Sequence, residues 1–290
     1  MTQNEIKFFK ENLLKISVSA YEIFEKSLKK DYLLDYFFNS HGVYTAIKSD
    51  SRDNYIVFYF SFDNSFSDVK IINEFIIKII NISKKYENRD IFFNFSGENL
   101  FLIEYFRKYF SLKTDSYGFQ YKIPRSSKDI LRIKTEKNYL VSDLKEIQYS
   151  NFILKDIAEL IDRSFYELDL VENNTGFYSE NPDYTFEIIK NAGRNFKLFS
   201  FKNELACLYI TKENFVSLIC VNPKFQGLGF GTFILYRAIE NLFKNPERLC
   251  GYLNCVEYNK KAQLFYEKNG LIKTSHFKEH TLEKNFSLIV

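Results

Sequence analysis

The sequence predicts an α/β fold built twice along the chain, each copy being a mixed, mostly antiparallel sheet flanked by helices. Hydrophobic residues make up 46% of the 290 residues, enough to bury a core in each copy. In the second half, three successive strand patterns precede alternating helix and strand patterns. A shift of 160 residues, which sets Tyr55 opposite Phe215, aligns elements of the same type in the two halves.

The elements of the second half begin with two helices. Ile157, Leu160 and Ile161 fall at helical spacing within Leu154–Tyr166, and a shorter helix is expected over Tyr184–Asn191. Three strands follow directly, and strand and helix then alternate, which predicts a mixed sheet covered by helices. The strands are expected at Phe196–Phe201, Leu205–Thr211, Phe215–Val221, Leu249–Val256, Leu271–His276 and Phe286–Val290, and the later helices at Gly231–Phe243 and Lys260–Asn269.

The domain boundary is expected near Thr135. The stretch Pro124–Asp129 is rich in residues typical of turns, and it separates the strand-like runs Gly118–Ile123 and Ile130–Lys134. This predicts a first domain over residues 1–134 and a second over residues 135–290.

Composition excludes several classes of function. Lys and Arg number 40 against 37 Asp and Glu, a balance that does not indicate a nucleic-acid partner. No apolar run is long enough to span a bilayer, and the first residues lack the pattern of a signal peptide, so we expect a cytoplasmic protein without membrane contact. The four cysteines form no CxxC pair and the three histidines have no metal-ligand spacing, so no metal site is expected.

A glycine-rich loop is the strongest functional signal. Gly227, Gly229 and Gly231 lie between an apolar strand and an apolar helix. Glycines let the backbone approach a ligand closely, and the free amides of a helix start attract anions, so we expect a bound phosphate or pyrophosphate. Thr232 adds a hydroxyl in the first turn. A dinucleotide-binding loop and a P-loop fit less well, because three strands precede this loop and the P-loop Lys-Ser/Thr pair is absent.

Two motifs resemble the GNAT superfamily of acyl-CoA N-acyltransferases. Val221–Gly231 is similar to the V-x-P-x-x-[RQ]-G-x-G-x-G loop of that family, and Asn259–Leu271 to its N-x-x-A-x-x-[FL]-Y-x-x-x-G-F segment. The resemblance covers about residues 138–290 and implies acetyl-CoA as co-substrate. Backbone amides would hold the pyrophosphate, strand backbone would pair with the pantetheine arm, and two asparagines would bind near that arm. These groups would be Gln226, Gly227, Leu228, Gly229, Phe230, Gly231 and Thr232 for the pyrophosphate, Ile219, Cys220 and Val221 for the strand, and Asn254 and Asn259.

The resemblance also implies catalytic roles. Tyr266 would protonate the leaving thiolate. Glu213, the carboxylate nearest the strand Phe215–Val221, would act as general base. Each residue has a plainer interpretation: Tyr266 as a core aromatic, Glu213 as a solvated turn residue, and Asn259 as a helix cap. Bulk water or a residue of the first helical region could serve as base instead.

The acceptor is expected to be a primary amine of a small molecule. Six acids and no Lys or Arg lie between Ser164 and Ile189, and such a rim would attract a cationic amine. An ordinary solvated loop is the alternative. The acids are Glu167, Asp169, Glu172, Glu180, Asp183 and Glu187.

The first half is interpreted as a degenerate copy without a CoA site. In the ungapped alignment Ser67, Val69 and Ile71 stand opposite the three loop glycines, and Phe106 stands opposite Tyr266.

For the whole chain, we expect an N-acetyltransferase that acts as a monomer or homodimer. A CoA-binding regulatory module without turnover is the alternative, and an aminoacyl- or peptidoglycan-directed transferase ranks third.

Overall fold

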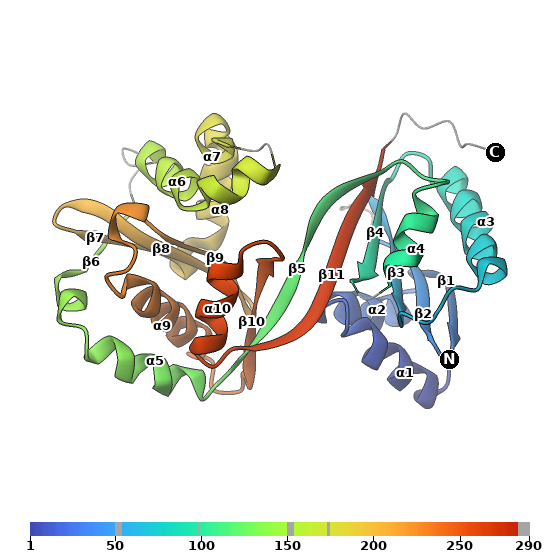
Figure 1. Cartoon of the computed structure of the whole chain (residues 1–290), viewed down its shortest axis with the longest axis horizontal. Helices are drawn as coiled ribbons and strands as arrows, with labels where there is room; N and C mark the ends of the chain where they lie inside the picture. Colours follow the sequence, from blue (N-terminus) through green and yellow to red (C-terminus); the bar gives the residue numbers. More distant parts are fainter. Residues whose placement is uncertain (50–53, 98, 150–153, 173–174, 284–290) are drawn as a thin grey trace. The chain divides into compact units, whose positions relative to one another are not determined.

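The computed structural model describes residues 1–49, 54–97, 99–149, 154–172 and 175–283. By their contacts these residues divide into two compact units (Figure 1). The first unit comprises Met1–Gln120 and the chain from Thr274 onward, and the second comprises Tyr121–Lys273. None of the described helices combines the length and apolarity that a bilayer-spanning segment needs.

The first unit contains two helices, a three-stranded antiparallel meander and then alternating helices and strands. β1, β2 and β3 pair antiparallel in that order, β3 pairs parallel with β4, and β11 pairs antiparallel with β4. The elements are α1 (Gln3–Leu13), α2 (Val18–Lys30), β1 (Leu33–Asn39), β2 (Gly42–Lys48), β3 (Tyr55–Phe62), α3 (Val69–Lys85), β4 (Asp90–Ser96), α4 (Leu100–Phe106), β5 (Leu112–Pro124) and β11 (Ile272–Leu282).

The second unit repeats this order with a helix and a strand added at its start and a short helix inserted before its antiparallel meander. β6, β7, β8 and β9 pair antiparallel in sequence, β9 pairs parallel with β10, and β5 follows β10 in the sheet. The elements are α5 (Ser127–Glu136), β6 (Lys145–Ile147), α6 (Leu154–Glu172), α7 (Phe177–Glu180), α8 (Pro182–Ala192), β7 (Phe196–Phe201), β8 (Glu204–Lys212), β9 (Phe215–Val221), α9 (Phe230–Leu242), β10 (Cys250–Val256) and α10 (Lys260–Lys268).

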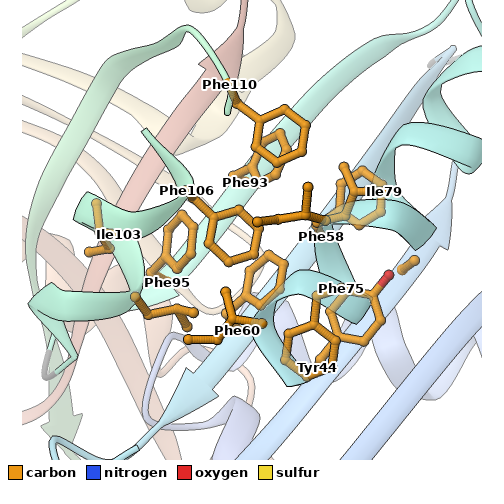
Figure 2. Packing of buried hydrophobic residues seen from close by; sticks show 14 of the residues in the cluster. Tyr44, Phe58, Phe60, Phe75, Ile79, Phe93, Phe95, Ile103, Phe106 and Phe110 are labelled. Atoms are coloured by element: carbon orange, nitrogen blue, oxygen red, sulfur yellow. The ribbon is translucent and has the colours of Figure 1, made fainter. Parts of the chain in front are cut away.

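In the first unit, side-chain alternation along the strands sorts the core into two layers. On one face of β2 and β3, Val43 and Val57 pack with residues of α1 and α2 such as Phe9 and Phe24. On the other face the strand residues meet α3 and α4 in a cluster dominated by phenylalanine (Figure 2). In the second unit, one face packs against α6 and α8, and α9 contacts β8 and β9. The predicted mixed α/β fold, repeated along the chain, is confirmed.

One predicted element differs from the structure, and another is not tested by it. Ile130–Lys134, expected as a strand, lies in helix α5, where Leu131 is buried and Ile130 and Ile133 are exposed, and α5 packs on α9. An apolar run this short is compatible with both the helical and the strand periodicity, so tertiary packing decides which element forms. The expected strand Phe286–Val290 lies outside the described residues.

The last strand of each half also changes the expected boundary at residue 135. β5 follows the four strands of the first half in sequence, yet it crosses into the second unit at Tyr121 and lies beside β10. β11 ends the second half but pairs with β4 from Phe277↔Ser96 to Thr281↔Phe92. Each unit therefore takes its strand next to β4 or β10 from the other half of the sequence.

Candidate active site

A cavity of about 740 Å³ opens at the carboxyl end of β9. Its walls come from α6, β9, the glycine loop, the start of α9, and α10 together with the residues just before it. Ten of the predicted site residues line it: Ile219, Cys220, Val221, Gln226, Gly227, Gly229, Gly231, Thr232, Asn259 and Tyr266. The structure thus brings together residues that are up to 47 positions apart in the sequence (266 minus 219).

The cavity exists because β9 and β10 separate. They pair at Phe215↔Tyr252, the start of β9, and at no later position in the described residues. A β-bulge lies next to this point. Thr211 of β8 pairs with Val216 of β9, and its neighbour Ile210 pairs with Leu218. Ser217 is therefore the extra residue in β9. A bulge bends its strand and ends regular pairing, which accounts for the divergence.

The divergence leaves backbone groups of β9 available on the open side. The Asn222 amide donates to the Ala206 carbonyl at 2.8 Å, and antiparallel pairs alternate between bonded and non-bonded, so Cys220 also bonds to β8. Ile219 and Val221 therefore direct their N–H and C=O groups away from β8, where the Val221 carbonyl accepts from Gln226 Nε2 at 3.3 Å and from Ser164 Oγ at 3.2 Å. This corrects the prediction for Cys220, whose backbone is used within the sheet, although its side chain lines the cavity.

The glycine loop ends in an uncapped helix start. Gly229 is the N-cap of α9, it has φ +86°, and no side chain caps the helix. Gly227 also has a positive φ, and a Cβ there would meet no atom within 4 Å, so both glycines adopt a backbone that other residues rarely accept. A Cβ at Gly231 would meet Phe265 at 3.5 Å, an ordinary contact, so packing within the protein does not require a glycine there.

Two of the seven predicted amide donors are engaged within the protein. The Gln226 amide donates to the Pro223 carbonyl at 3.2 Å, and the Thr232 amide donates to the Gly229 carbonyl at 3.1 Å. In the described part of the chain, the amides of residues 227–231 donate to no backbone carbonyl outside the regular helices and strands. These five consecutive N–H groups and the dipole of α9 form an anion-binding position.

Leu228 and Phe230 support the loop from outside the cavity. The Leu228 carbonyl accepts a hydrogen bond from Asn138 Nδ2 at 2.7 Å. Phe230 is fully buried, with its ring 5.1 Å from Phe201 and 6.2 Å from Phe225. The Leu228 carbonyl and the buried Phe230 ring therefore anchor the loop, and neither side chain is among the described residues that line the cavity.

Positive side chains border the same anion-binding position. Arg163, Lys260 and Lys261 line the cavity, and Lys261 Nζ donates to Gln226 Oε1 at 3.2 Å. Gln226 Nε2 donates in turn to the Val221 carbonyl at 3.3 Å, so Lys261 is tied through Gln226 to the end of β9. These cations would add to the attraction that the loop amides exert on a phosphate.

Tyr266 projects from α10 into the buried end of the site. It is 7% exposed and lies among Cys220, Cys255 and Tyr121. Burial raises the pKa of the Tyr266 phenol far above its usual value, and those three neighbours raise this pKa further. The phenol is therefore neutral near pH 7, and its hydroxyl is present as a hydrogen-bond donor.

The two predicted asparagines have different positions. Asn259 lines the cavity and also caps α10, because its Oδ1 accepts the Ala262 amide at 3.0 Å. The two functions considered for Asn259 are therefore geometrically compatible. Asn254 lies exposed on β10 and is not among the described residues that line the cavity.

Glu213 does not lie at the cavity. It is exposed in the turn between β8 and β9, with φ +51°, so it precedes β9 while the cavity lies beyond the end of that strand. Seven residues of extended chain span roughly 23 Å, too far for proton transfer to a substrate in the cavity. The geometry therefore does not support Glu213 as general base.

The predicted acidic rim is only partly described. The side chains of Glu167, Asp169 and Glu172 lie outside the described residues. Of the others, Glu180 and Asp183 are exposed and Glu187 is paired with Lys190 at 3.0 Å. The described residues that line the cavity include no carboxylate and no imidazole.

Three contacts at the site were not predicted from the sequence. Ser164 Oγ lies 2.7 Å from the Leu160 carbonyl and 3.2 Å from that of Val221, so it joins α6 to the end of β9. Asn138 supports the loop through Leu228, and Lys261 contacts Gln226. Of these residues, only Lys261 could have been found from the sequence, because it is a cation in the first turn of the helix in the Asn259–Leu271 motif. The contacts of Ser164 and Asn138 depend on residues distant in sequence.

The corresponding helix start of the first unit is capped by a side chain, beside a smaller cavity of about 370 Å³. Asp68 caps α3, and its Oδ1 accepts the Lys70 amide at 3.0 Å and the Ile71 amide at 3.2 Å. Because α3 starts at Val69 and α9 at Phe230, Asp68 corresponds to Gly229. The ungapped alignment, which set Val69 against Gly229, is one residue out of register here because β3 has no counterpart of Ser217.

Comparisons with known proteins agree with this geometry. Residues 159–271 match the family model described as "Acetyltransferase (GNAT) family". No curated protein sequence matches the chain. Among solved structures, a functionally unknown conserved protein from Staphylococcus epidermidis is similar in fold, with a TM-score of 0.53 and 14% identity over 86% of this chain and 93% of that chain.

Two further solved structures are similar at lower scores. One is a tandem GNAT protein from the clavulanic acid biosynthesis pathway, with a TM-score of 0.47 and 12% identity over 99% of this chain and 97% of that one. The other is a GCN5-related N-acetyltransferase from Sphaerobacter thermophilus, with a TM-score of 0.49 and 9% identity over 98% and 92% of the two chains.

Proposed function

Since this chain belongs, through residues 159–271, to the GNAT superfamily of acyl-CoA N-acyltransferases, we propose that its second unit transfers an acetyl group from acetyl-CoA to the primary amine of a small molecule. Acyl transfer is the general activity of the family. The acetyl donor and the amine acceptor are the specific parts of the proposal, and they depend on the chemistry of the cavity.

The observation that carries the proposal is that an uncapped helix start and an unpaired strand edge border one cavity. The amides of residues 227–231 suit a pyrophosphate. The outward N–H and C=O of Ile219 and the outward N–H of Val221 suit the amides of a pantetheine arm, which would pair with β9 as an added strand. The residues present therefore fit acetyl-CoA, which supplies the activated acyl group when bound.

The reaction requires a positioned thioester, a neutral amine and an acid. The amine nitrogen attacks the acyl carbon, the bond from carbon to sulfur breaks, and the sulfur leaves as a thiolate. Tyr266 is the group we assign as acid, because its phenol lines the cavity and stays protonated. The protons balance if the proton that the nitrogen loses as the amide forms is passed to the Tyr266 phenolate, which restores the acid. An N–H of Ile219 or Val221 would stabilise the negative charge on the acyl oxygen.

The acceptor is proposed to be a cationic amine. Six acids lie between Ser164 and Ile189, and their summed field would raise the local concentration of a positively charged substrate. The base is proposed to be water or an acid of this segment, since the described lining residues offer no carboxylate.

The test measures CoA release from acetyl-CoA with a panel of primary amines, including diamines and triamines, alongside neutral amines as controls. We expect release that depends on the amine and falls about 100-fold in Tyr266→Phe, with acetyl-CoA binding by calorimetry unchanged. If acetyl-CoA binds but no amine causes release, the second unit is a CoA-binding module without turnover. If acetyl-CoA does not bind at all, the proposal is wrong.

A further inference from the structure

We propose that Tyr121 is a positioning residue for Tyr266, an inference that rests on the proposed function. Tyr121 lies on β5, the strand that follows the first copy of the fold in sequence and lies beside β10 in the second unit. No motif of the second copy includes it. The residue that orients the proposed acid thus comes from the strand that the first half supplies.

Tyr121 contacts α10 at two adjacent residues. Its ring centroid lies 5.6 Å from that of Tyr266, at an interplanar angle of 58°. Its hydroxyl donates to Glu267 Oε1 at 3.1 Å. Tyr121 is fully buried, so its ring contact with the 7% exposed Tyr266 is shielded from solvent, whereas the hydrogen bond ends on the partly exposed carboxylate of Glu267. A tilted ring pair limits the rotation of both rings, and the hydrogen bond from the buried Tyr121 restrains the distance between β5 and α10.

The hydrogen bond to Glu267 belongs to a short chain of polar contacts. Lys273 Nζ lies 3.3 Å from Glu267 Oε1 and 3.4 Å from Gln263 Oε1. Gln263 Nε2 donates to the carbonyls of Val256 and Glu257 at the end of β10. Helix α10 is therefore held to β5, the start of β11 and the end of β10, three points around Tyr266.

This arrangement matters for the reaction more than for binding. Proton donation to a leaving thiolate needs the hydroxyl within hydrogen-bond distance of the sulfur, and small displacements of a catalytic group reduce rates strongly. The glycine loop and the edge of β9, which are proposed to bind acetyl-CoA, make no described contact with Tyr121. Loss of the Tyr121 hydroxyl should therefore lower kcat and leave the KM for acetyl-CoA unchanged.

The test compares Tyr121→Phe, which keeps the ring and removes the hydroxyl, with Glu267→Ala, which removes the acceptor from a partly exposed position. Tyr209→Phe is the matched control, because Tyr209 is a buried tyrosine of the same unit on β8 that does not line the cavity. We expect kcat to fall about tenfold in the first two variants, with unchanged KM for acetyl-CoA, and to stay at the wild-type value in the control.

A double-variant comparison separates positioning from general stability. If Tyr121 acts through Tyr266, Tyr121→Phe causes no further loss in a Tyr266→Phe background, whereas an unrelated structural effect would multiply with it. Equal kcat in wild type, Tyr121→Phe and Glu267→Ala would overturn the inference, as would a full tenfold further loss in the double variant. The proposed function fails separately, if the wild-type protein transfers no acetyl group or if Tyr266→Phe is fully active.

Discussion

In the first unit β3 and β4 stay paired from Tyr55↔Asp90 to Phe60↔Phe95, whereas in the second unit β9 and β10 separate after Phe215↔Tyr252. The two units share their element order, so the difference is local. β3 pairs with β2 without interruption, but β9 carries the bulge at Ser217. One extra residue in one strand is associated with an open strand edge in the second unit and a closed sheet in the first.

The two units also differ in the side chains beside these strands and in the capping of the helices α3 and α9. In the first unit Phe60, Phe95 and Phe106 pack together, with Phe60 4.9 Å from each of the other two (Figure 2). After correction for the bulge, Phe60 corresponds to Val221, and the starts of α4 at Leu100 and α10 at Lys260 set Phe106 opposite Tyr266; Val221 and Tyr266 both line the cavity. Asp68 satisfies the amides at the start of α3, whereas those of α9 stay available. The first unit has filled the space that the second leaves for a ligand.

The largest expected effect comes from closing the glycine loop. Gly231→Val should weaken acetyl-CoA binding at least 100-fold, because a branched side chain would occupy the approach to the helix amides while the protein itself has room for a Cβ. Calorimetry with acetyl-CoA measures the change. Ala192→Val is the control, since Ala192 is a half-buried helical residue of α8 that does not line the cavity. Undiminished binding in Gly231→Val would show that the loop does not hold the ligand.

Filling the cavity in the manner of the first unit should have the next largest effect. Val221→Phe introduces the residue found at Phe60, and we expect acetyl-CoA binding to weaken about 30-fold with little change in the thermal midpoint. Leu218→Phe is the matched control, a half-buried position on β9 outside the cavity lining. If the two variants bind acetyl-CoA equally well, the cavity at the end of β9 is not the binding site.

Acid should destabilise the first unit through His280. Burial lowers the pKa of this imidazole to about 4, with Arg107 and Lys278 contributing, from an unfolded value near 6.5. The unfolded state then binds more protons, so stability is present above about pH 6.5 and is lost as the pH falls toward 4. Between pH 7 and 5 the loss should be roughly 1–2 kcal/mol.

Urea unfolding at the two pH values measures this loss, and His280→Gln provides the comparison. The variant should show a smaller difference between pH 7 and 5 than the wild type does. An equal difference in both proteins would mean that another group carries the pH dependence.

The smallest expected effect concerns the cap that closes α3. Asp68→Ala should cost about 1 kcal/mol of stability, because the amides of Lys70 and Ile71 lose their acceptor. It should not create a second acetyl-CoA site, because the phenylalanine cluster and the paired strands remain. Calorimetry should still give one acetyl-CoA per chain, and a stoichiometry of two would contradict the proposed division between the units.

Local sequence patterns were sufficient for several features of this protein. The spacing of apolar residues located α6, β7, β8, β9, α9 and α10 to within a few residues, apart from the end of α6, because side chains of one period form one buried face. The three glycines, between an apolar strand and an apolar helix, indicated an anion-binding loop, since backbone conformation at a glycine is a local property. The repeat was visible because element type follows local periodicity.

Only the tertiary structure decided the rest. The bulge at Ser217, the divergence of β9 from β10, the crossing of β5 and β11 into opposite units, and the contacts of Tyr121 and Ser164 all depend on strand register and on residues distant in sequence. Register is set by which strands meet and how their faces pack, and a local pattern does not contain that information. The sequence alone therefore determined which backbone could hold a phosphate, and the assembled sheet determined that an open strand edge and Tyr266 would lie beside it.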